Sequence, residues 1–354
     1  MKIEQVRINR FTLERIDSSW RTATYSARAV DGFIVQILAG DFIGVGATAA
    51  HPNNISGDDL ERQLVGPIKE ACVGQDPLFR STICAAAAAK NIHPRALMAL
   101  DLALYDLLGK IADLPCHAFW GGALRKKIKV VRMVGIKAPL ELSETVGALL
   151  DEGYKHFKIK FGTGIARDVE SIRHLREHFG PEIWISVDAN GAYATDEAIE
   201  LSRRLEEFNI SSIEQPVNYR DLSGLAEVSR ASAVPIMADQ CVRDPASALA
   251  VCRSQAAHIV SLKSTSLGSI DNCRRVYEIC RSFGIRVHFG GSVSSSIVDV
   301  AQAQLAASLA EADEECEVGE FMAVRGEPVV APTIDNGELE ISSQAGWGVT
   351  LADL

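Results

Sequence analysis

The residues of this sequence best suited to catalysis are lysines and carboxylates that stand at the carboxyl ends of short apolar segments. In chain order they are Lys158, Lys160, Asp188, Glu214, Asp239 and Lys263. Three carboxylates brought to one low-dielectric place, with no arginine beside them in the sequence, repel one another. A hard divalent cation removes that repulsion, and all-oxygen ligation favours Mg²⁺, with Mn²⁺ as a substitute, over zinc. The alternative is that each carboxylate caps the helix that follows it.

The spacing of these residues predicts the elements that bring them together. The apolar segments end at positions 160, 188, 214, 239, 263 and 288, which are 24 to 28 residues apart. A period of this size is one strand plus one helix, and six such units in series predict a parallel sheet closed into a (β/α) barrel. The carboxyl ends of barrel strands meet at one mouth, where active sites are built. Because strand side chains alternate, Lys158 and Lys160 both face the barrel interior.

The first 125 residues follow a different pattern. Segments 6–11 and 32–38 indicate strands, and residues 41–44 stand where a hairpin turn is expected. From His93 onward, apolar residues recur at three- and four-residue steps, which predicts a helix that ends within residues 109–115. This part of the chain is therefore expected to form an α+β unit with an antiparallel sheet, while amphipathic segments of the later part supply the outer helices of the barrel.

The charge balance limits the classes of partner. The chain has 354 residues, with 36 Lys and Arg against 46 Asp and Glu and a formal net charge of −10. Such a surface repels phosphate backbones and anionic lipid, and the one dense basic segment, 125–129, is too short to bind either. No apolar run reaches the ~20 residues of a membrane span, no signal peptide is visible, and the eight cysteines form no CxxC pair. We expect a cytoplasmic enzyme with free thiols and no nucleic-acid or membrane partner.

Five short motifs carry a resemblance to a known family. They are Lys158-Ile159-Lys160, Asp188-Ala189-Asn190, Glu214-Gln215-Pro216, Ala238-Asp239 and Lys263. Together they resemble the enolase superfamily, and more narrowly its muconate-lactonizing-enzyme subgroup. The resemblance covers nearly the whole chain and extends to the helix at 99–110, to Gly121-Gly122 and to the final segment around 346–349.

The resemblance implies a fold and a metal site. The fold is α/β: a modified TIM (β/α) barrel at residues 126–324, with an N-terminal α+β capping domain at residues 1–125 that is completed by about residues 325–354. Mg²⁺ would bind the carboxylate of a small-molecule substrate. Its ligands would be Asp188, Glu214 and Asp239, with Asn190 and Gln240 beside them. In the family a glutamate is common at the position of Gln240.

The resemblance also implies a mechanism in which two lysines epimerise or racemise the substrate. One lysine removes the proton α to the substrate carboxylate, and the metal stabilises the enediolate that forms. Lys160 approaches one face of the α-carbon and Lys263 the other, so a proton removed by one is returned by the other and the centre is inverted. A lysine must be neutral to act as a base. Lys158, a like charge beside Lys160, is expected together with the metal to lower the pKa of Lys160.

Substrate specificity is expected to reside in two loops that resemble the capping loops of dipeptide epimerases. Their candidate substrate contacts are Trp20, Arg21, Tyr25 and His51. Tyr25 stands where an arginine binds an acidic side chain, and Glu317 alone stands where two aspartates hold the substrate's ammonium. These departures favour a substrate with one carboxylate and a neutral or blocked nitrogen, such as an N-acylated or N-alkylated amino acid.

Three further candidates have two interpretations each. His288, at the end of the seventh strand, either contacts substrate or packs inside the barrel. Ser292, within the segment 290–296, belongs either to a backbone cradle for an anion or to a simple turn. Trp20 and Arg21 either cover the site, with the arginine pairing with a second anionic group of the substrate, or lie on a solvated loop.

Other functions use the same residues. Cycloisomerisation and β-elimination proceed through the same intermediate as epimerisation in this subgroup. A Schiff-base aldolase would use Lys263 but leaves the three carboxylates unexplained. A non-catalytic binding protein on the same fold is a further alternative, because fold does not imply function. By analogy with the family, we expect a homo-oligomer.

Overall fold

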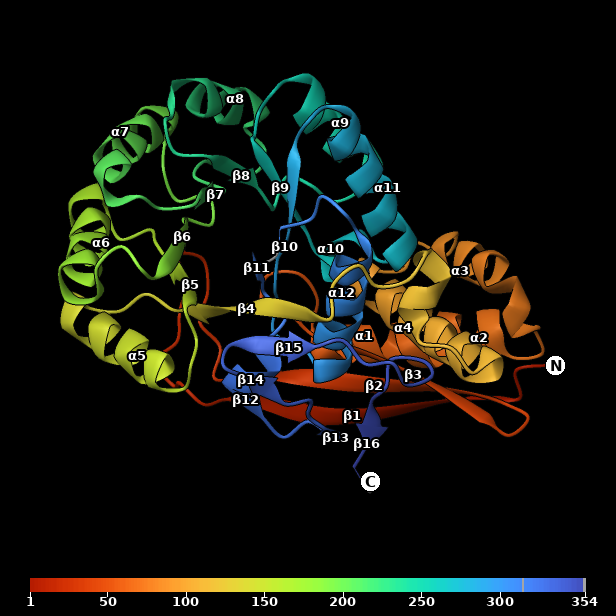
Figure 1. Cartoon of the computed structure of the whole chain (residues 1–354). Coiled ribbons are helices and arrows are strands. Elements are labelled where there is room, and N and C mark those ends of the chain that lie inside the picture. Colours follow the sequence, from red (N-terminus) through yellow and green to blue (C-terminus); the bar gives the residue numbers. More distant parts are fainter. Residues whose placement is uncertain (314, 353–354) are drawn as a thin grey trace.

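Eight parallel strands form a barrel in the computed structural model, which describes residues 1–313 and 315–352 (Figure 1). In order around the ring they are β4 (Lys127–Val134), β5 (His156–Lys160), β6 (Trp184–Asp188), β7 (Ile213–Glu214), β8 (Ile236–Ala238), β9 (Ile259–Leu262), β10 (Arg286–Phe289) and β11 (Glu315–Cys316). β11 pairs with β4, and the ring closes because the Glu317 N–H donates to the Phe289 carbonyl at 2.8 Å. The (β/α) barrel predicted from the spacing is confirmed.

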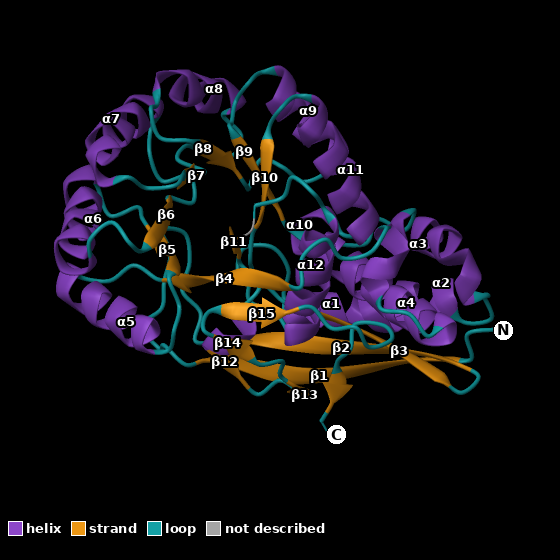
Figure 2. Ribbon diagram, in the orientation of Figure 1, coloured by secondary structure: helices purple, strands orange, loops and turns teal. Residues whose placement is uncertain are grey.

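Helices cover the outside of the barrel, so its strands are buried from both sides (Figure 2). They are α5 (Pro139–Asp151), α6 (Ile165–Phe179), α7 (Thr195–Leu205) with η4 (Glu206–Phe208), α8 (Leu222–Ala231), α9 (Pro245–Arg253), α10 (Ser264–Leu267), α11 (Ile270–Ser282) and α12 (Ser296–Ser308). Every residue of α12 is buried, because this helix packs between the barrel strand β4 and the N-terminal part of the chain.

An antiparallel sheet and a group of helices form the N-terminal unit beside the barrel (Figure 1). Its strands, in sheet order, are β12 (Val324–Arg325), β1 (Gln5–Arg15), β2 (Ala29–Ala39) and β3 (Phe42–Ala49). Its helical segments are α1 (Gly57–Gln63), η1 (Leu64–Ile68), α2 (Lys69–Cys72), η2 (Pro77–Phe79), α3 (Arg80–Ala88), α4 (Pro94–Ala112) and η3 (Cys116–Trp120). The α+β unit predicted for the first 125 residues is confirmed in its secondary structure.

The hairpin turn between β2 and β3 differs from the prediction in position. It lies at Gly40 and Asp41, whereas the sequence suggested residues 41–44, because Phe42 already pairs with Ala39 in the sheet. Gly40 has a φ of 54°, a left-handed conformation that glycine adopts without steric cost and that a tight hairpin requires.

The segment after the barrel returns to both parts of the molecule. β15 (Glu338–Glu340) pairs with β4 and with β14 (Ile334–Asp335), while β13 (Val329–Val330) pairs with β16 (Thr350–Leu351) and η5 (Glu320–Ala323) precedes β12. Trp347 is fully buried, and its indole Nε1 donates to the Leu102 carbonyl of α4 at 2.9 Å. The exact division of the chain near residues 125 and 325 stays a prediction.

The described residues contain no membrane-spanning helix and no disulfide bond. No helix within residues 1–313 and 315–352 is long and apolar enough to cross a membrane. All eight cysteines lie in this part of the chain and are free thiols, as predicted.

Glycines allow α4 to pack closely against β3. A Cβ added at Gly46 would overlap the carbonyl oxygen of Ala99 and lie 2.6 Å from the backbone nitrogen of Ala103. Both neighbours are helix backbone and cannot move aside as a flexible side chain does. The spacing of α4 from the sheet therefore depends on this glycine.

We predict that Gly46→Ala lowers the free energy of unfolding by about 1–3 kcal/mol, because it forces β3 and α4 apart. Urea denaturation followed by circular dichroism measures the change. The control is Gly66→Ala, where an added Cβ meets nothing within 4 Å. Equal midpoints for Gly46→Ala and the wild type would contradict the packing account.

Candidate functional site

The ends of neighbouring strands bring the predicted lysines and carboxylates to one mouth of the barrel. In the parallel register, Lys160 lies opposite Asp188, and Asp188 lies opposite Glu214. Asp239 directly follows the last residue of β8, and Lys263 directly follows β9. Since parallel register aligns the carboxyl ends of β5 to β9, their terminal side chains share one small volume.

Lys158 is buried to 1% exposure among three carboxylates. Its Nζ lies 3.0 Å from Glu214 Oε2, 2.6 Å from the Glu317 carboxylate and 3.8 Å from Asp188 Oδ2. Burial alone lowers the pKa of a lysine, but these carboxylates together raise the pKa of Lys158 well above its usual value. Lys158 is therefore an ammonium that holds the carboxylates together beneath the mouth.

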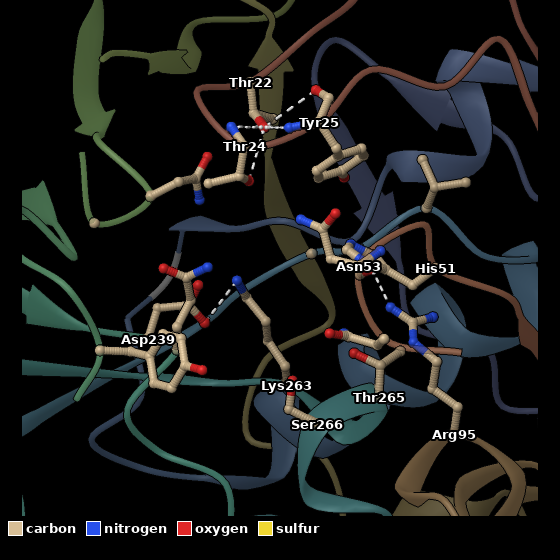
Figure 3. A pocket seen from close by; sticks show the side chains of 18 of the residues that line it. Thr22, Thr24, Tyr25, His51, Asn53, Arg95, Asp239, Lys263, Thr265 and Ser266 are labelled. Atoms are coloured by element: carbon tan, nitrogen blue, oxygen red, sulfur yellow. Dashed lines mark hydrogen bonds and ion pairs between the residues drawn. The ribbon is translucent and has the colours of Figure 1, made fainter. Parts of the chain in front are cut away.

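The other two lysines make ion pairs at the mouth itself. Lys160 Nζ contacts Asp188 Oδ2. Lys263 Nζ lies 2.7 Å from Asp239 Oδ1 and 3.3 Å from Glu214 Oε1. Figure 3 shows the ammonium of Lys263 directed at Asp239 across the floor of a pocket. Each lysine therefore reaches the mouth while paired with a carboxylate on a neighbouring strand or on the next but one.

The carboxylates repel one another in this buried setting. The pKa of Asp239 rises to about 6, first because of burial and then because Glu214 and Asp188 are negative, although Lys263 opposes the rise. In Glu317, burial raises the pKa, but Lys158 and a hydrogen bond from His288 outweigh it and lower the pKa below its usual range. The site concentrates more negative charge than apolar surroundings tolerate without cations.

The chemistry of these side chains fits a hard dication. Asp188, Glu214 and Asp239 are buried oxygen donors on three adjacent strands. Two amide oxygens beside them, Asn190 Oδ1 and Gln240 Oε1, are buried and accept no hydrogen bond, and a hydrated cation carries the donors that they lack. Among the described residues, no group of three carboxylate, imidazole or thiol side chains is arranged to hold a metal ion. Asp188, Glu214 and Asp239 are instead paired with lysine ammonium groups.

A pocket of about 690 Å³ opens above the strand ends. The predicted site residues that line it are Trp20, Tyr25, His51, Lys160, Asn190, Asp239, Gln240, Lys263 and Ser292. The first three belong to the N-terminal unit and the others to the barrel, so the pocket lies between the two (Figure 3). A substrate bound here touches both units.

The remaining predicted site residues lie elsewhere. Lys158, Asp188 and Glu214 are buried beneath the pocket and are not part of its lining. Arg21 is exposed and contributes its backbone carbonyl to a hydrogen bond from the Ile136 N–H at 2.9 Å. The structure therefore does not place the Arg21 side chain where it could pair with a group of the substrate.

His288 and Glu317 hold each other inside the barrel. His288 Nε2 lies 3.1 Å from Glu317 Oε1, and the Gly291 N–H donates to Glu317 Oε2 at 2.7 Å. With Lys158 as a third partner, the Glu317 carboxylate is fully engaged and has no exposed surface. Of the two interpretations of His288, the structure favours the packed, hydrogen-bonded one.

Aromatic rings build the wall that the N-terminal unit contributes. The ring centroids of Trp20 and Tyr25 are 5.6 Å apart, and those of Tyr25 and His51 are 4.8 Å apart in an edge contact. The Arg15 guanidinium stacks 3.4 Å from the Trp20 ring centroid. Because these residues come from β1 and from the loops after β1 and β3, the wall depends on the sheet being intact.

A glycine makes room for Lys263. A Cβ added at Gly290, after β10, would overlap Ser261 Oγ and the Cε atom of Lys263. The extended lysine chain therefore runs across the backbone of the next strand end, a close approach that only glycine permits.

The pocket also contains charged residues that the sequence did not single out. They are Arg15, Arg95 and Arg243. None stands at the end of a predicted barrel strand, and Arg95 lies in the first turn of α4, a helix predicted from its apolar face alone. The Pro94 that starts this helix signals its N-terminus but not what the N-terminus faces.

Comparisons with known proteins agree with this geometry. The family model described as "Enolase C-terminal domain-like" matches residues 141–353. The chain is 30% identical over 315 residues to an N-succinylamino acid racemase of Amycolatopsis sp., covering 86% of this chain and 83% of the relative. It is 29% identical over 313 residues to a hydrophobic dipeptide epimerase of Enterococcus faecalis, covering 87% and 88%.

Solved structures extend the similarity to the whole fold. A dipeptide epimerase from Enterococcus faecalis V583, complexed with Mg and the dipeptide L-Leu-L-Tyr, superposes with a TM-score of 0.94 at 25% identity. The match covers 99% of this chain and 100% of that chain. A muconate cycloisomerase of Rhodococcus opacus is also among the relatives.

The charge of His51 depends on the pocket around it. Burial and the positive charges of nearby groups lower the pKa of His51 to about 3; these groups are Arg95, Lys263, Lys160 and Arg15. The pKa of His51 in the folded protein thus lies below the usual value of about 6.5, which applies in the unfolded chain. When the pH falls below about 6.5, the unfolded chain binds a proton at His51 that the folded protein does not bind, and this destabilises the fold.

We predict that the His51→Gln variant loses less stability on acidification than the wild type. At pH 5 the wild type carries a penalty of about 1–2 kcal/mol from this one group, which is absent at pH 8. Urea denaturation at both pH values measures the difference, with His178→Gln on the exposed side of α6 as the control. The same pH dependence in the wild type and His51→Gln would show that His51 is not held neutral.

Proposed function

The chain belongs to the enolase superfamily and is an isomerase, and on this premise we propose that it is a Mg²⁺-dependent epimerase or racemase that inverts the α-carbon of a carboxylate substrate. The substrate we propose is an amino acid with a neutral, substituted nitrogen, and the alternative is a dipeptide, whose amino terminus is an ammonium. Mn²⁺ is proposed as a substitute metal, because the ligands are all oxygens.

One observation carries the proposal: Lys160 and Lys263 line the same pocket from strands on opposite sides of the barrel. Lys160 ends β5 and Lys263 follows β9, four strands further around a ring of eight, so they approach the pocket from opposite sides. A carbon bound between two such amines presents one face to each. Removal of its proton by one amine and delivery of a proton by the other inverts the centre.

The three carboxylates supply the second requirement. Asp188, Glu214 and Asp239 would hold a dication, whose positive charge would stabilise the negative charge that develops on the substrate carboxylate when the adjacent α-carbon loses a proton. Lys158 is better described as a positioning residue than as a base, because it is paired with Glu214 and Glu317 beneath the pocket. Asn190 donates its amide N–H to Asp188 at 3.0 Å and so orients that carboxylate.

The lining of the pocket supports a neutral nitrogen in the substrate. Glu317, which the resemblance offered for an ammonium, is fully engaged by Lys158, His288 and Gly291. Among the described residues, Asp239 is the one acidic side chain in the pocket lining, and it belongs to the proposed metal site. An ammonium on the substrate would meet no free carboxylate here.

Cycloisomerisation is the second candidate function. Its support is the similarity to a muconate cycloisomerase, together with a floor of carboxylates and lysines that serves either reaction. A cycloisomerase needs one base to act on one face of the carbon. The two functions therefore make different predictions for the two lysines.

We predict that Lys160→Ala and Lys263→Ala each lose racemisation by about 10³-fold, because each removes the amine on one face. The measurement is α-proton exchange and loss of optical rotation in D₂O with Mg²⁺, over a panel of dipeptides and N-substituted amino acids. Each variant should still exchange one enantiomer, and the two variants should exchange opposite enantiomers.

The control for this experiment is Lys155→Ala, which removes an exposed lysine before the other end of β5. If one of the two variants keeps full racemisation, or if both lose exchange of the same enantiomer only, a one-base reaction replaces the proposal. If no member of the panel exchanges with the wild type, the proposed substrate class is wrong.

A further inference from the structure

Arg95 is a buried guanidinium without a carboxylate partner. Its side chain is 3% exposed; Nη1 donates to the Ala49 carbonyl at 3.0 Å and Nη2 to Ser292 Oγ at 2.6 Å. Within residues 1–313 and 315–352, no Asp or Glu oxygen lies within 4.0 Å of its guanidinium nitrogens. A guanidinium has five N–H groups, so two neutral acceptors leave it under-satisfied.

Arg80 shows how the same protein treats a comparable group. Arg80 is 9% exposed, and its two Nη atoms pair with the carboxylates of Asp101 and Asp271. Burying a charge is costly unless an opposite charge accompanies it. Arg95, which is more deeply buried, lacks the counter-ion that Arg80 has.

The surroundings of Arg95 keep its charge uncompensated. Burial lowers the pKa of Arg95 to about 10, so it is still positive at neutral pH. The pKa values of the neighbouring His51 and His93 are lowered to about 3 and about 4, first by burial and partly by Arg95 itself, so both rings are neutral. None of these neighbours supplies negative charge.

Arg95 lies at the pocket in which the substrate is proposed to bind. Arg95 lines the pocket together with His93 and Pro94, so the N-terminus of the 19-residue helix α4 opens into the same space. The positive end of the helix dipole adds to the charge of the guanidinium. In Figure 3, Arg95 enters from the N-terminal unit, whereas Asp239 and Lys263 lie on the barrel side.

The other arginines of the pocket are engaged elsewhere. Arg15 stacks on Trp20, and Arg243 donates to the Gln240 carbonyl at 3.1 Å while its guanidinium lies 4.2 Å from the Tyr219 ring centroid. Arg95 is thus the arginine of the lining that combines deep burial with unused donors. A ligand with a negative group would form an ion pair with the Arg95 guanidinium in these buried, low-dielectric surroundings.

We propose that Arg95, oriented by Ser292, binds a second anionic group of the substrate, at a distance from the carboxylate that lies beside the reacting carbon. This inference rests on the proposed function and adds to it the charge of the substrate. The second group sits either on the substituent of the nitrogen or on the amino-acid side chain. The role that the sequence suggested for Arg21 thereby passes to Arg95.

The test compares substrates that differ in where a second carboxylate stands. N-acetylalanine has one carboxylate, N-succinylalanine has a second on the nitrogen substituent, and N-acetylglutamate has a second on the side chain. We expect the wild type to exchange the α-proton of one dicarboxylate with a kcat/KM at least 10-fold above that of N-acetylalanine. Which dicarboxylate is preferred identifies the position of the second group.

In Arg95→Gln, the preference for the dicarboxylate should fall at least 10-fold, mainly through a higher KM. Arg95→Lys keeps the positive charge but loses the planar set of guanidinium N–H donors, and it should retain part of the preference for the dicarboxylate. Arg243→Gln removes a positive charge from the same pocket and should leave the ratio between substrates within 3-fold. The thermal midpoint of each variant shows whether it is folded.

Two results would overturn the inference. One is a wild type whose kcat/KM for N-acetylalanine equals its kcat/KM for either dicarboxylate. The other is an Arg95→Gln variant that loses activity toward all three substrates in equal proportion, which a purely structural arginine would cause.

A second measurement separates this inference from the proposed function. If no substrate exchanges with the wild type, the proposed function fails, and calorimetric titration with N-succinylglycine and N-acetylglycine then tests Arg95 alone. At least 10-fold tighter binding of N-succinylglycine by the wild type than by Arg95→Gln supports the anion site. Equal binding of the two ligands by the wild type contradicts it.

Discussion

The structure depends on the balance of buried charge at the mouth of the barrel. Four carboxylates and three lysines converge there with almost no access to water, and each carboxylate is tolerated because an ammonium lies beside it. Lys158 joins β5 to Glu214 and also to Glu317, which follows the closing strand β11. Lys160 pairs with Asp188 and Lys263 pairs with Asp239, so ion pairs between strands also hold the other two lysines at the mouth. Their positions on opposite sides of the pocket are a consequence of closure.

The N-terminal unit contributes the wall of the pocket, which we propose recognises the rest of the substrate. Its aromatic wall and Arg95 stand on β1, on the loops after β1 and β3 and on α4, and Gly46 sets the spacing between β3 and α4. The floor of the pocket is thus suited to a reaction, and its wall is suited to selecting which carboxylate enters. The proposed dication on the floor and the Arg95 guanidinium in the wall would both favour negative ligands, although the protein as a whole carries a net charge of −10.

The barrel and its mouth can be predicted from the sequence because both are periodic. A strand plus a helix recurs every 24 to 28 residues, and side chains that end parallel strands must meet, so the spacing alone predicts that Asp188, Glu214 and Asp239 lie together. The sequence does not reveal Arg95, because its place arises from contacts with Ala49 and Ser292, 46 and 197 residues away in the chain, and such contacts leave no periodic pattern. The partners of Glu317 are hidden from the sequence for the same reason.

The central claim is that two lysines act on opposite faces of one carbon, and the wild-type enzyme tests it most directly. A single enantiomer of a racemised substrate is converted in D₂O with Mg²⁺, and the inverted product is isolated after a few per cent of reaction. The account predicts deuterium at the α-carbon of essentially every product molecule, because the proton that completes inversion comes from the second lysine, which has exchanged with solvent. A product that retains the hydrogen of its own substrate would contradict the account, because one base would then have carried that hydrogen from face to face.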